Sequence, residues 1–477
     1  MKLDTSEEIK NLKLNILKSG VWYSVGNILN ILLGLIKLYI MAKIFDPKEY
    51  GIYSITLMMM TLVQSFTTIG ARDYLIREAY PNEKTITTAF TIDLIRGWVA
   101  FFIMFIIALP ISKLYEEPIL AQYLSTVSLS FLFIAFRNIN IYKLYSEFRG
   151  RHTFLVMQFP IIVTNVLIIV VAIIYKNIFL VVILNVVTEL LITVFSYLIY
   201  FRRPKIWIYK KEFKNLFSFS AQLFLMTILA YALRQIDYYF VSFYFGLEVL
   251  ALYTLAFRIM NIITESILPV VMNIFYPLIS KSTEIKRREY IKYLINGILA
   301  FFILFGINVY LYMDELIFYV FKDKWNGLYD LLLFFVVYSM VRALLSVIGL
   351  NLKVNNKLKY ENYSSTIEMI AIGVLIYPLS FLYDIYGVAI SITIALLIRF
   401  IMINSISSKL FNINLMKMIM KKDILLFAIL SMTINIMVVK LFDMSNILYT
   451  ILPILTNLGI VSIFTCLFIW YRIKSSK

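Results

Sequence analysis

Apolar runs of roughly 20 residues recur along the whole sequence, separated by short polar segments. A helix of about 20 residues spans the ~30 Å hydrocarbon core of a bilayer. Hydrophobic residues make up 61% of the chain and charged residues 15%, whereas soluble domains are about half apolar and about a quarter charged. Because lipid offers no partner for backbone polar groups, such runs cross the membrane as α-helices. The sequence therefore predicts an all-α polytopic membrane protein.

The apolar runs predict about 14 transmembrane helices. Most of the 45 Lys and Arg residues fall in the segments on one side when the N-terminus is placed inside. Cytoplasmic loops are enriched in Lys and Arg, so both termini are predicted in the cytoplasm and the protein in the plasma (inner) membrane. The predicted spans are 14–42, 50–71, 87–111, 119–142, 154–175, 178–201, 216–244, 249–279, 291–312, 329–351, 364–383, 387–408, 423–441 and 446–471.

An internal repeat with an offset of 200 residues organises these spans. GWVAFFIMF at 97–105 returns as GILAFFILF at 297–305, with six of nine positions identical. The same offset sets LIKLYIMAKIF at 35–45 against QIDYYFVSFYF at 235–245. Equivalent helices cross in the same direction, which predicts two six-helix lobes in a parallel pseudo-two-fold repeat. The predicted domains are an N-lobe (1–201), a cytoplasmic linker (202–215), a C-lobe (216–408), and two extra helices with a tail (409–477).

Charged residues occur inside the predicted spans, where each costs about 2.5–3.5 kcal/mol if it faces lipid. They must therefore face a water-filled cavity or one another. The basic ones are Lys37, Arg96, Arg137, Arg234, Arg258, Arg342 and Arg399, and the acidic ones are Asp93, Glu189, Asp237, Glu265 and Glu368. Asp93 and Glu368 are predicted to be wetted near the inner interface.

Some of these charges have an acidic neighbour on the same predicted helix. Arg234 and Asp237 are three residues apart, as are Asp93 and Arg96, which places each pair on one helix face. Arg258 and Glu265 are two turns apart. An ion pair that holds helices together is an open alternative to a functional role for these groups.

Arg137 and Arg342 have no acidic residue within four positions. They occupy equivalent predicted helices of the two lobes, and Lys37 is likewise without an acid nearby in the sequence. Guanidinium groups stay charged and match phosphate oxygens in a bidentate fashion. The pattern predicts a cationic cavity between the lobes that binds an anionic head group. A distant ion pair for the arginines, and pairing of Lys37 with Asp237, remain the alternatives.

Several function classes are excluded by what the sequence lacks. The chain contains one His and one Cys, so no metal site built from these residues is predicted. No glycine-rich phosphate loop followed by Lys-Ser/Thr is present, so ATP hydrolysis is not expected. The net charge is +17, and most basic residues lie in segments beside predicted membrane spans. This position favours anionic lipid over nucleic acid as their binding partner. We expect a transporter that is not an enzyme and has no cofactor.

Four segments resemble one known family. MAKIFDPKEYGIYSI (41–55) is similar to the link between its first two helices, and LYSEFRGRHTFLVMQ (144–158) resembles the signature after its fourth helix, with Arg149 and Arg151 at the basic positions. VLALYTLAFRIMNII (249–263) and LPVVMNIFYPLISK (268–281) resemble its eighth helix. The chain thus resembles, over essentially its whole length, the Wzx-type polysaccharide and O-antigen flippases of the multidrug/oligosaccharidyl-lipid/polysaccharide (MOP) exporter superfamily.

The resemblance implies a two-lobed transporter that alternates access to a central cavity. It implies a cargo of a few sugars on a polyprenyl diphosphate, membrane lipids as surroundings, and glycan polymerase or glycosyltransferase machinery as partners. The candidate residues for binding the diphosphate or sugar acids are Arg137, Arg342, Lys37, Arg234 and Arg258. The acidic Asp237 departs from a uniformly basic cavity, so Asp237, Glu265 and Glu189 are candidates for ion coupling or ion pairing.

Two other function classes fit the sequence less well. A multidrug or cation antiporter of the same superfamily favours an acidic cavity, whereas basic residues outnumber acidic ones within the spans here. A membrane glycan polymerase or acyltransferase needs a catalytic base and usually a large outer loop, and the longest predicted outer loop is only about 313–328. The antiporter remains the runner-up.

Overall fold

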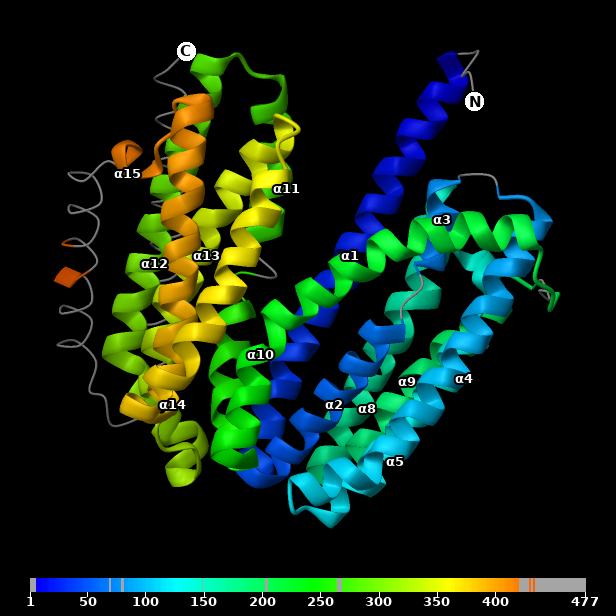
Figure 1. Cartoon of the computed structure of the whole chain (residues 1–477), viewed down its shortest axis with the longest axis horizontal. Helices are drawn as coiled ribbons and strands as arrows, with labels where there is room; N and C mark the ends of the chain where they lie inside the picture. Colours follow the sequence, from blue (N-terminus) through cyan, green and yellow to red (C-terminus); the bar gives the residue numbers. More distant parts are fainter. Residues whose placement is uncertain are drawn as a thin grey trace. The chain divides into compact units, whose positions relative to one another are not determined.

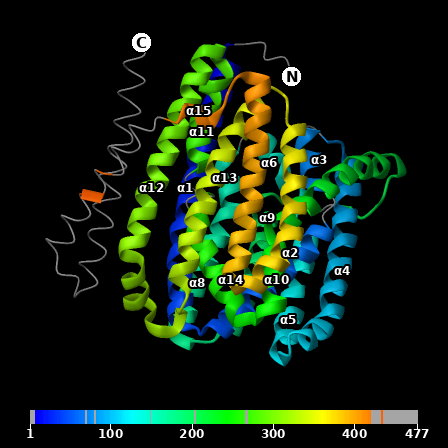
Figure 2. The same cartoon turned by 60° about the vertical axis from the view of Figure 1, so that its left-hand side comes forward.

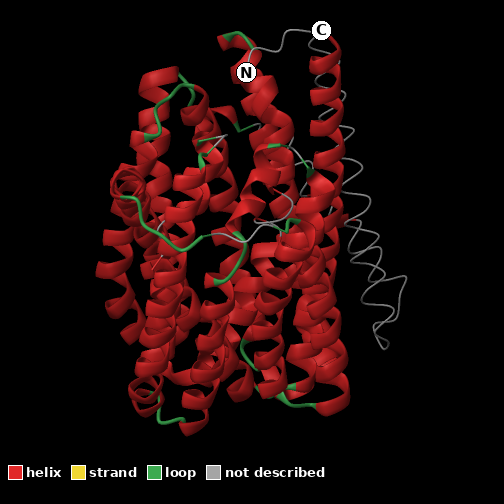
Figure 3. Cartoon of the chain, turned by 90° about the vertical axis from the view of Figure 1, so that its right-hand side faces the viewer, coloured by secondary structure: helices red, strands yellow, loops and turns green. Residues whose placement is uncertain are grey.

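A computed structural model of the chain describes residues 6–67, 70–78, 81–147, 149–201, 205–262, 264, 268–419, 429, 432 and 433. Within these residues all regular elements are helices, and no strand occurs (Figure 3). Nine helices in this part of the chain are long and apolar enough to cross a membrane. A bent pair, α2 (Pro47–Thr67) and α3 (Ala71–Arg77), makes ten if it forms one span. The predicted all-α polytopic membrane fold is confirmed.

The chain divides into two compact units. Unit 1 comprises Met1–Ile236 and Gly246–Ala251, and unit 2 comprises Asp237–Phe245 and Leu252–Lys477. The boundary between them falls inside α10 (Lys210–Ile262).

Unit 1 is a helical bundle in which α4 packs on α5, α5 and α8 pack on α9, and α1 packs on α8 (Figure 1). Apolar side chains cover its outer surface. Ile106 of α4, for example, is 67% exposed, as expected for a side chain in lipid. Besides α2, α3 and the start of α10, its elements are α1 (Ser6–Ile44), α4 (Glu83–Leu114), α5 (Pro118–Ala135), η1 (Ile139–Ile141), α6 (Tyr142–Ser146), α7 (Gly150–Thr153), η2 (Phe154–Gln158), α8 (Phe159–Tyr175) and α9 (Ile178–Ile199).

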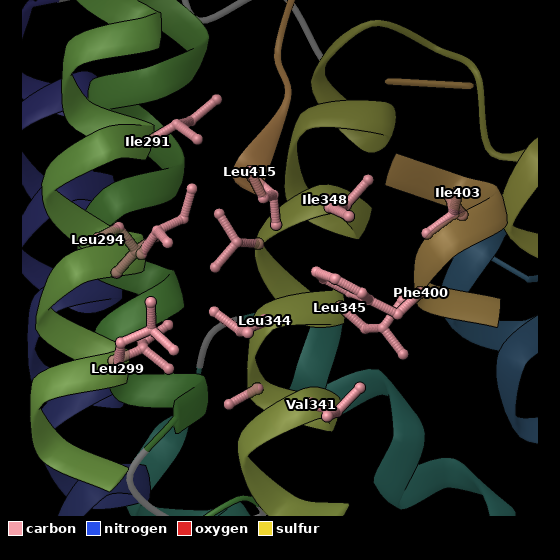
Figure 4. Packing of buried hydrophobic residues seen from close by; sticks show 14 of the residues in the cluster. Ile291, Leu294, Leu299, Val341, Leu344, Leu345, Ile348, Phe400, Ile403 and Leu415 are labelled. Atoms are coloured by element: carbon pink, nitrogen blue, oxygen red, sulfur yellow. The ribbon is translucent and has the colours of Figure 1, made fainter. Parts of the chain in front are cut away.

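Unit 2 packs α13 between α12 and α14, with α11 against α12 and α13 (Figure 2). Its elements after α10 are α11 (Leu268–Lys281), α12 (Glu284–Phe321), η4 (Lys322–Trp325), α13 (Leu328–Val354), α14 (Lys359–Phe411) and α15 (Leu415–Met418). Aliphatic and aromatic side chains of these helices interdigitate in one core (Figure 4). The labelled members are Ile291, Leu294, Leu299, Val341, Leu344, Leu345, Ile348, Phe400, Ile403 and Leu415.

Two helices of 53 residues, α10 and α14, are each broken once. The halves of α14 hold the predicted spans 364–383 and 387–408, whereas α10 holds 216–244 and only the first part of 249–279, whose last part is α11. The break in α10 is at Gly246, whose φ of 84° is accessible to glycine at little cost. The break in α14 is at Tyr383 and Asp384. Gly387 after this break lies against the carbonyl of Leu379 before it, so the halves of α14 form a hairpin.

Most predicted spans that fall on described residues coincide with helices to within a few residues. The prediction of a continuous span over 119–142 is wrong, because α5 ends at Ala135 and is followed by a turn, η1 and α6. The last two predicted spans, 423–441 and 446–471, lie almost wholly outside the described residues. The predicted parallel repeat and the domain boundaries stay predictions.

Gly97 allows the close approach of α4 and α5. A Cβ at this position would lie 2.2 Å from the Cβ of Ala135 and 2.7 Å from the carbonyl oxygen of Phe131. We expect Gly97→Ala to lower the free energy of unfolding by about 1–3 kcal/mol, as overpacking does. The apparent Tm in detergent measures this. Gly34→Ala is the matched control because nothing lies within 4 Å of its Cβ; equal Tm values for both variants would contradict the packing.

Candidate functional site: charged and amide side chains in the spans

Arg137 and Glu189 form an ion pair in unit 1. The guanidinium Nη2 lies 2.5 Å from Glu189 Oε2, and the two side chains are 14% and 22% exposed. Glu189 lies on α9, 52 residues from Arg137. The expectation of an arginine without a carboxylate partner therefore does not hold, and the distant ion pair that was the alternative is present. The Arg137 Nε–H is buried and has no hydrogen-bond partner among the described residues.

The end of α5 is fixed by polar side chains of α9, and this places Arg137 opposite Glu189. The last carbonyls of a helix lack intrahelical partners. Here Thr193 Oγ1 donates to the carbonyl of Phe133 at 2.7 Å, and the Tyr197 hydroxyl donates to that of Phe136 at 2.9 Å. Because α9 supplies these donors, the chain can leave the helix inside the bundle without stranding its carbonyls.

Tyr142 lies at the start of α6, outside the spanning helices, and several charged residues surround it. Burial raises the pKa of its hydroxyl above the usual value. Four charged residues act on this hydroxyl electrostatically: Arg137, Asp93, Arg72 and Arg96. The Arg72 guanidinium lies over the Tyr142 ring, 5.9 Å from its centroid.

We call Arg72, Asp93, Arg96, Arg137 and Glu189 the unit 1 charge cluster. It contains three cations and two anions. Arg96 Nε lies 3.1 Å from Asp93 Oδ1, so the ion pair expected from their spacing on α4 is present. Sequence reasoning missed Arg72, which follows a break between helices and lies outside the apolar runs.

Lys37 of α1 donates from Nζ to Asn165 Oδ1 of α8 at 2.8 Å. Two further amides of α1 join α8 through the residue before it: Asn30 Nδ2 donates to Gln158 Oε1 at 2.5 Å, and Gln158 Nε2 to Asn27 Oδ1 at 3.5 Å. Gln158 ends η2, a π-helical turn, and such turns are frequent at functional sites. Sequence reasoning missed these amides, although polar residues recurring in an apolar run were the available signal.

Asp237 of unit 2 is 4% exposed and accepts a hydrogen bond of 2.8 Å from the Tyr253 hydroxyl. Both residues lie on α10, before and after its break at Gly246. The ring of Tyr253 meets Tyr238 and Phe335 edge to face, with centroids 5.4 and 5.2 Å apart. This carboxyl group is therefore held in an aromatic pocket between the two arms of α10 and α13.

Arg342 of α13 donates from Nη1 to Asn261 Oδ1 of α10 at 3.4 Å. Arg258, one turn before Asn261, is exposed, and Arg234 on the same long helix is also exposed. Glu265 lies outside the described residues. Arg342 is thus half-buried against Asn261 of α10, whereas Arg234 and Arg258 lie at the surface of that helix.

The expectation that Glu368 is wetted at the interface is wrong. Glu368 is 6% exposed and its Oε2 lies 2.6 Å from Arg399 Nη1. Arg399 Nη2 also approaches Glu361 Oε1 at 3.9 Å. Both acids lie in the first arm of α14 and Arg399 in the second, so this triad joins the arms of the hairpin. Among the described residues, no group of three or more His, Cys, Asp or Glu side chains could hold a metal ion.

Comparison with known proteins assigns the family. Residues 40–330 match the family described as "Polysaccharide biosynthesis protein". The chain is 22% identical to "Lipopolysaccharide biosynthesis protein WzxC" of Escherichia coli (strain K12) over 359 residues, which cover 71% of this chain and 70% of that protein.

Solved structures share the fold. "Lipid II flippase MurJ, inward closed conformation" superposes with a TM-score of 0.66 at 17% identity, over 96% of this chain and 100% of that one. An inward-facing multidrug resistance MATE family transporter of the MOP superfamily gives a TM-score of 0.58 at 14% identity, over 82% of this chain and 95% of that one. The family match covers more than half of the sequence, so the chain belongs to the polysaccharide biosynthesis protein family and has the fold of the MOP superfamily, as its four segments predicted.

Proposed function

We propose that the protein is a flippase that moves a polyprenyl-diphosphate-linked oligosaccharide, the repeat unit of a surface polysaccharide, from the cytoplasmic to the outer leaflet. The family match over residues 40–330 carries this proposal. The names of a lipopolysaccharide biosynthesis relative and of a structurally similar lipid II flippase support it. The cargo is amphipathic and anionic, which suits a polytopic helical protein whose spans contain cations.

The diphosphate is bound by cations of a central cavity. The geometry of Arg137 supports this role. Glu189 orients its guanidinium group through Nη2, and its buried Nε–H remains available to an acceptor. Lys37 and Arg342 each contact a neutral amide oxygen, of Asn165 and Asn261. Such an oxygen orients the cation, and Arg342 also acts electrostatically on the Asp237 carboxyl group. Charge-assisted hydrogen bonds to phosphate are about twice as strong as neutral ones.

Transport proceeds by alternating access. In this proposal the lobes 1–201 and 216–408 rock about the linker 202–215, and the polyprenyl tail stays in lipid near the helices of 409–477. Arg234 and Arg258, exposed on α10, meet the sugar acids. Asp237, Glu189 and Glu265 are the groups through which an ion gradient would act, because acidic residues within spans bind or release cations.

In this proposal the protein lies in the plasma (inner) membrane with both termini in the cytoplasm, which the positive-inside pattern of the sequence supports. Its partners are the lipid-linked oligosaccharide, the surrounding lipids, and the glycosyltransferases and polymerase that make and consume the cargo.

Deleting the gene in the source organism tests the proposed function. We expect loss of the surface polysaccharide and accumulation of the polyprenyl-diphosphate oligosaccharide in the inner leaflet, both reversed by the wild-type gene. The measurements are surface glycan staining and mass spectrometry of extracted lipid. Unchanged glycan together with increased drug sensitivity would overturn the proposal in favour of a multidrug antiporter.

A further inference from the structure

We propose that residues 205–217, here called the linker surface, bind anionic phospholipid head groups of the inner leaflet. This segment joins α9 to α10 and begins the latter helix. It combines a backbone fixed to α4, apolar side chains that point away from the protein, and a cluster of lysines. The inference concerns lipid around the protein and is independent of the proposed cargo.

Threonines of α4 hold the extended part of the linker surface. The Trp207 amide donates to Thr91 Oγ1 at 2.9 Å. The one proton of the Thr91 hydroxyl is shared between the carbonyls of Thr87, at 2.8 Å, and Trp207, at 3.1 Å. The Tyr209 amide donates to Thr88 Oγ1 at 3.1 Å. Thr88 and Thr91 are one turn apart on the same face of α4. Their hydroxyls replace the partners that a neighbouring strand would provide, so the segment has a fixed position on the helix.

The helical part is also anchored. Leu216 is 1% exposed and packs in a core with Tyr74 of α3 and Ala89 of α4. Phe219 packs on Tyr74, with ring centroids 5.6 Å apart, and the Arg77 guanidinium lies 4.5 Å from the Phe219 centroid. Figure 1 shows the start of α10 beside α3 and one end of α4. The exposed side chains of the linker surface are therefore presented by a rigid support.

The position on α4 gives the depth of the linker surface in the membrane. α4 has 32 residues, or about 48 Å at 1.5 Å per residue, against a hydrocarbon core of ~30 Å. Its first turns therefore extend into the head-group region. Thr88 and Thr91 lie five and eight residues after its first residue, Glu83, which places Trp207 near the boundary between head groups and acyl chains.

Apolar and basic side chains alternate on this support. Ile206, Trp207 and Phe217 are 65%, 63% and 60% exposed. Four exposed lysines flank them: Lys205, Lys210, Lys211 and Lys214. Glu212, the acid of the segment, accepts from Thr85 of α4 at 3.4 Å and so faces the protein. The outward face is strongly basic.

This chemistry fits an anionic lipid surface. Trp favours the membrane interface, and apolar side chains beside lysines are typical of segments that lie in the interface plane. A lysine near an anionic leaflet contributes about 1 kcal/mol of attraction. At the depth of Trp207 the apolar side chains contact acyl chains. The lipid head groups lie next to this depth on the aqueous side, so they are the anions within reach of the lysines.

The first arm of the test locates Trp207. The full-length protein and its W207F variant are placed in nanodiscs of phosphatidylcholine with phosphatidylglycerol brominated near the top of the acyl chain. The difference in emission between the two proteins is due to Trp207. We expect the brominated lipid to quench this difference and aqueous iodide to leave it unchanged. Quenching by iodide and not by the brominated lipid would overturn the proposal.

The second arm tests the lysines. We compare K205Q/K210Q/K211Q/K214Q with a control that removes the same number of exposed inner charges elsewhere, K281Q/K286Q/K357Q/K359Q. The phosphatidylglycerol retained by each purified protein is counted by mass spectrometry. Since one lysine contributes about fivefold in lipid partitioning, we expect at least a tenfold loss in the first variant and less than twofold in the control. Equal losses of phosphatidylglycerol in the two variants would show that only total charge matters and would overturn the proposal that the linker surface binds these lipids.

Discussion

Replacing Arg137 with Gln lowers the free energy of unfolding by about 3 kcal/mol, because Glu189 is left as a charge inside the bundle without its partner. The pair is 2.5 Å apart and both side chains are largely buried. The lower end of the range for buried pairs applies, since Glu189 keeps 22% exposure. The measurement is thermal unfolding of the purified protein in a mild detergent, with tryptophan emission as the readout.

A double-mutant cycle separates the ion pair from other effects of the substitution. E189Q alone should destabilise the protein as well, and R137Q/E189Q should recover most of the stability, because two neutral amides can hydrogen-bond to each other. The recovered double variant then shows whether charge is needed for transport. If R137Q unfolds at the wild-type temperature, the ion pair has no structural importance and the site described above is wrong.

Neutralising Lys37 and Arg342 is expected to do the opposite, abolishing transport while leaving the fold intact. In K37Q and R342Q the hydrogen bond lost within the protein is one to a neutral amide, of Asn165 or Asn261, so we expect the fold to tolerate the change. What is lost is a charged hydrogen bond to the cargo phosphate, which contributes about 1.5–3 kcal/mol, or roughly 10- to 150-fold in binding. The readouts are surface glycan and the lipid-linked precursor in cells.

Each variant has a matched control on its own helix. Lys43 of α1 and Lys353 of α13 are exposed basic residues near helix ends, and K43Q and K353Q should export glycan at the wild-type level. Protein in the membrane fraction is quantified by immunoblot for all four variants. Normal export by K37Q and R342Q at wild-type protein levels would remove both residues from the mechanism.

The helices could be predicted from sequence because each depends on a local property, the length of an apolar run. The ion pair of Asp93 and Arg96 was also predictable, since three residues on one helix fix their proximity. The partner of Arg137 was not, because Glu189 is 52 positions away and no local pattern reports which helices pack together. The same holds for Asn30 and Gln158, which are 128 positions apart.

The end of α5 shows a second limit. Apolar residues recur up to Tyr142 between Arg137, Asn138 and Asn140, so the predicted span was extended to there. Donors from α9 to the carbonyls of Phe133 and Phe136 let the helix end at Ala135. The prediction for Glu368 was wrong for a related reason. Its position near the end of an apolar run indicated contact with water, whereas the α14 hairpin buries it against Arg399. In both cases tertiary contacts overrode a local signal.

Flipping by the purified protein in liposomes provides the decisive comparison. A fluorescent polyprenyl-diphosphate oligosaccharide is incorporated, and a membrane-impermeant sugar-oxidising reagent reports the fraction in the outer leaflet over time. We predict rapid movement in liposomes with the wild-type protein, inhibition by excess unlabelled diphosphate carrier, and little inhibition by the same prenol without phosphate. Movement no faster than in protein-free liposomes, with folded protein present, or equal inhibition by both competitors, would contradict a cation-lined route for a diphosphate-linked cargo.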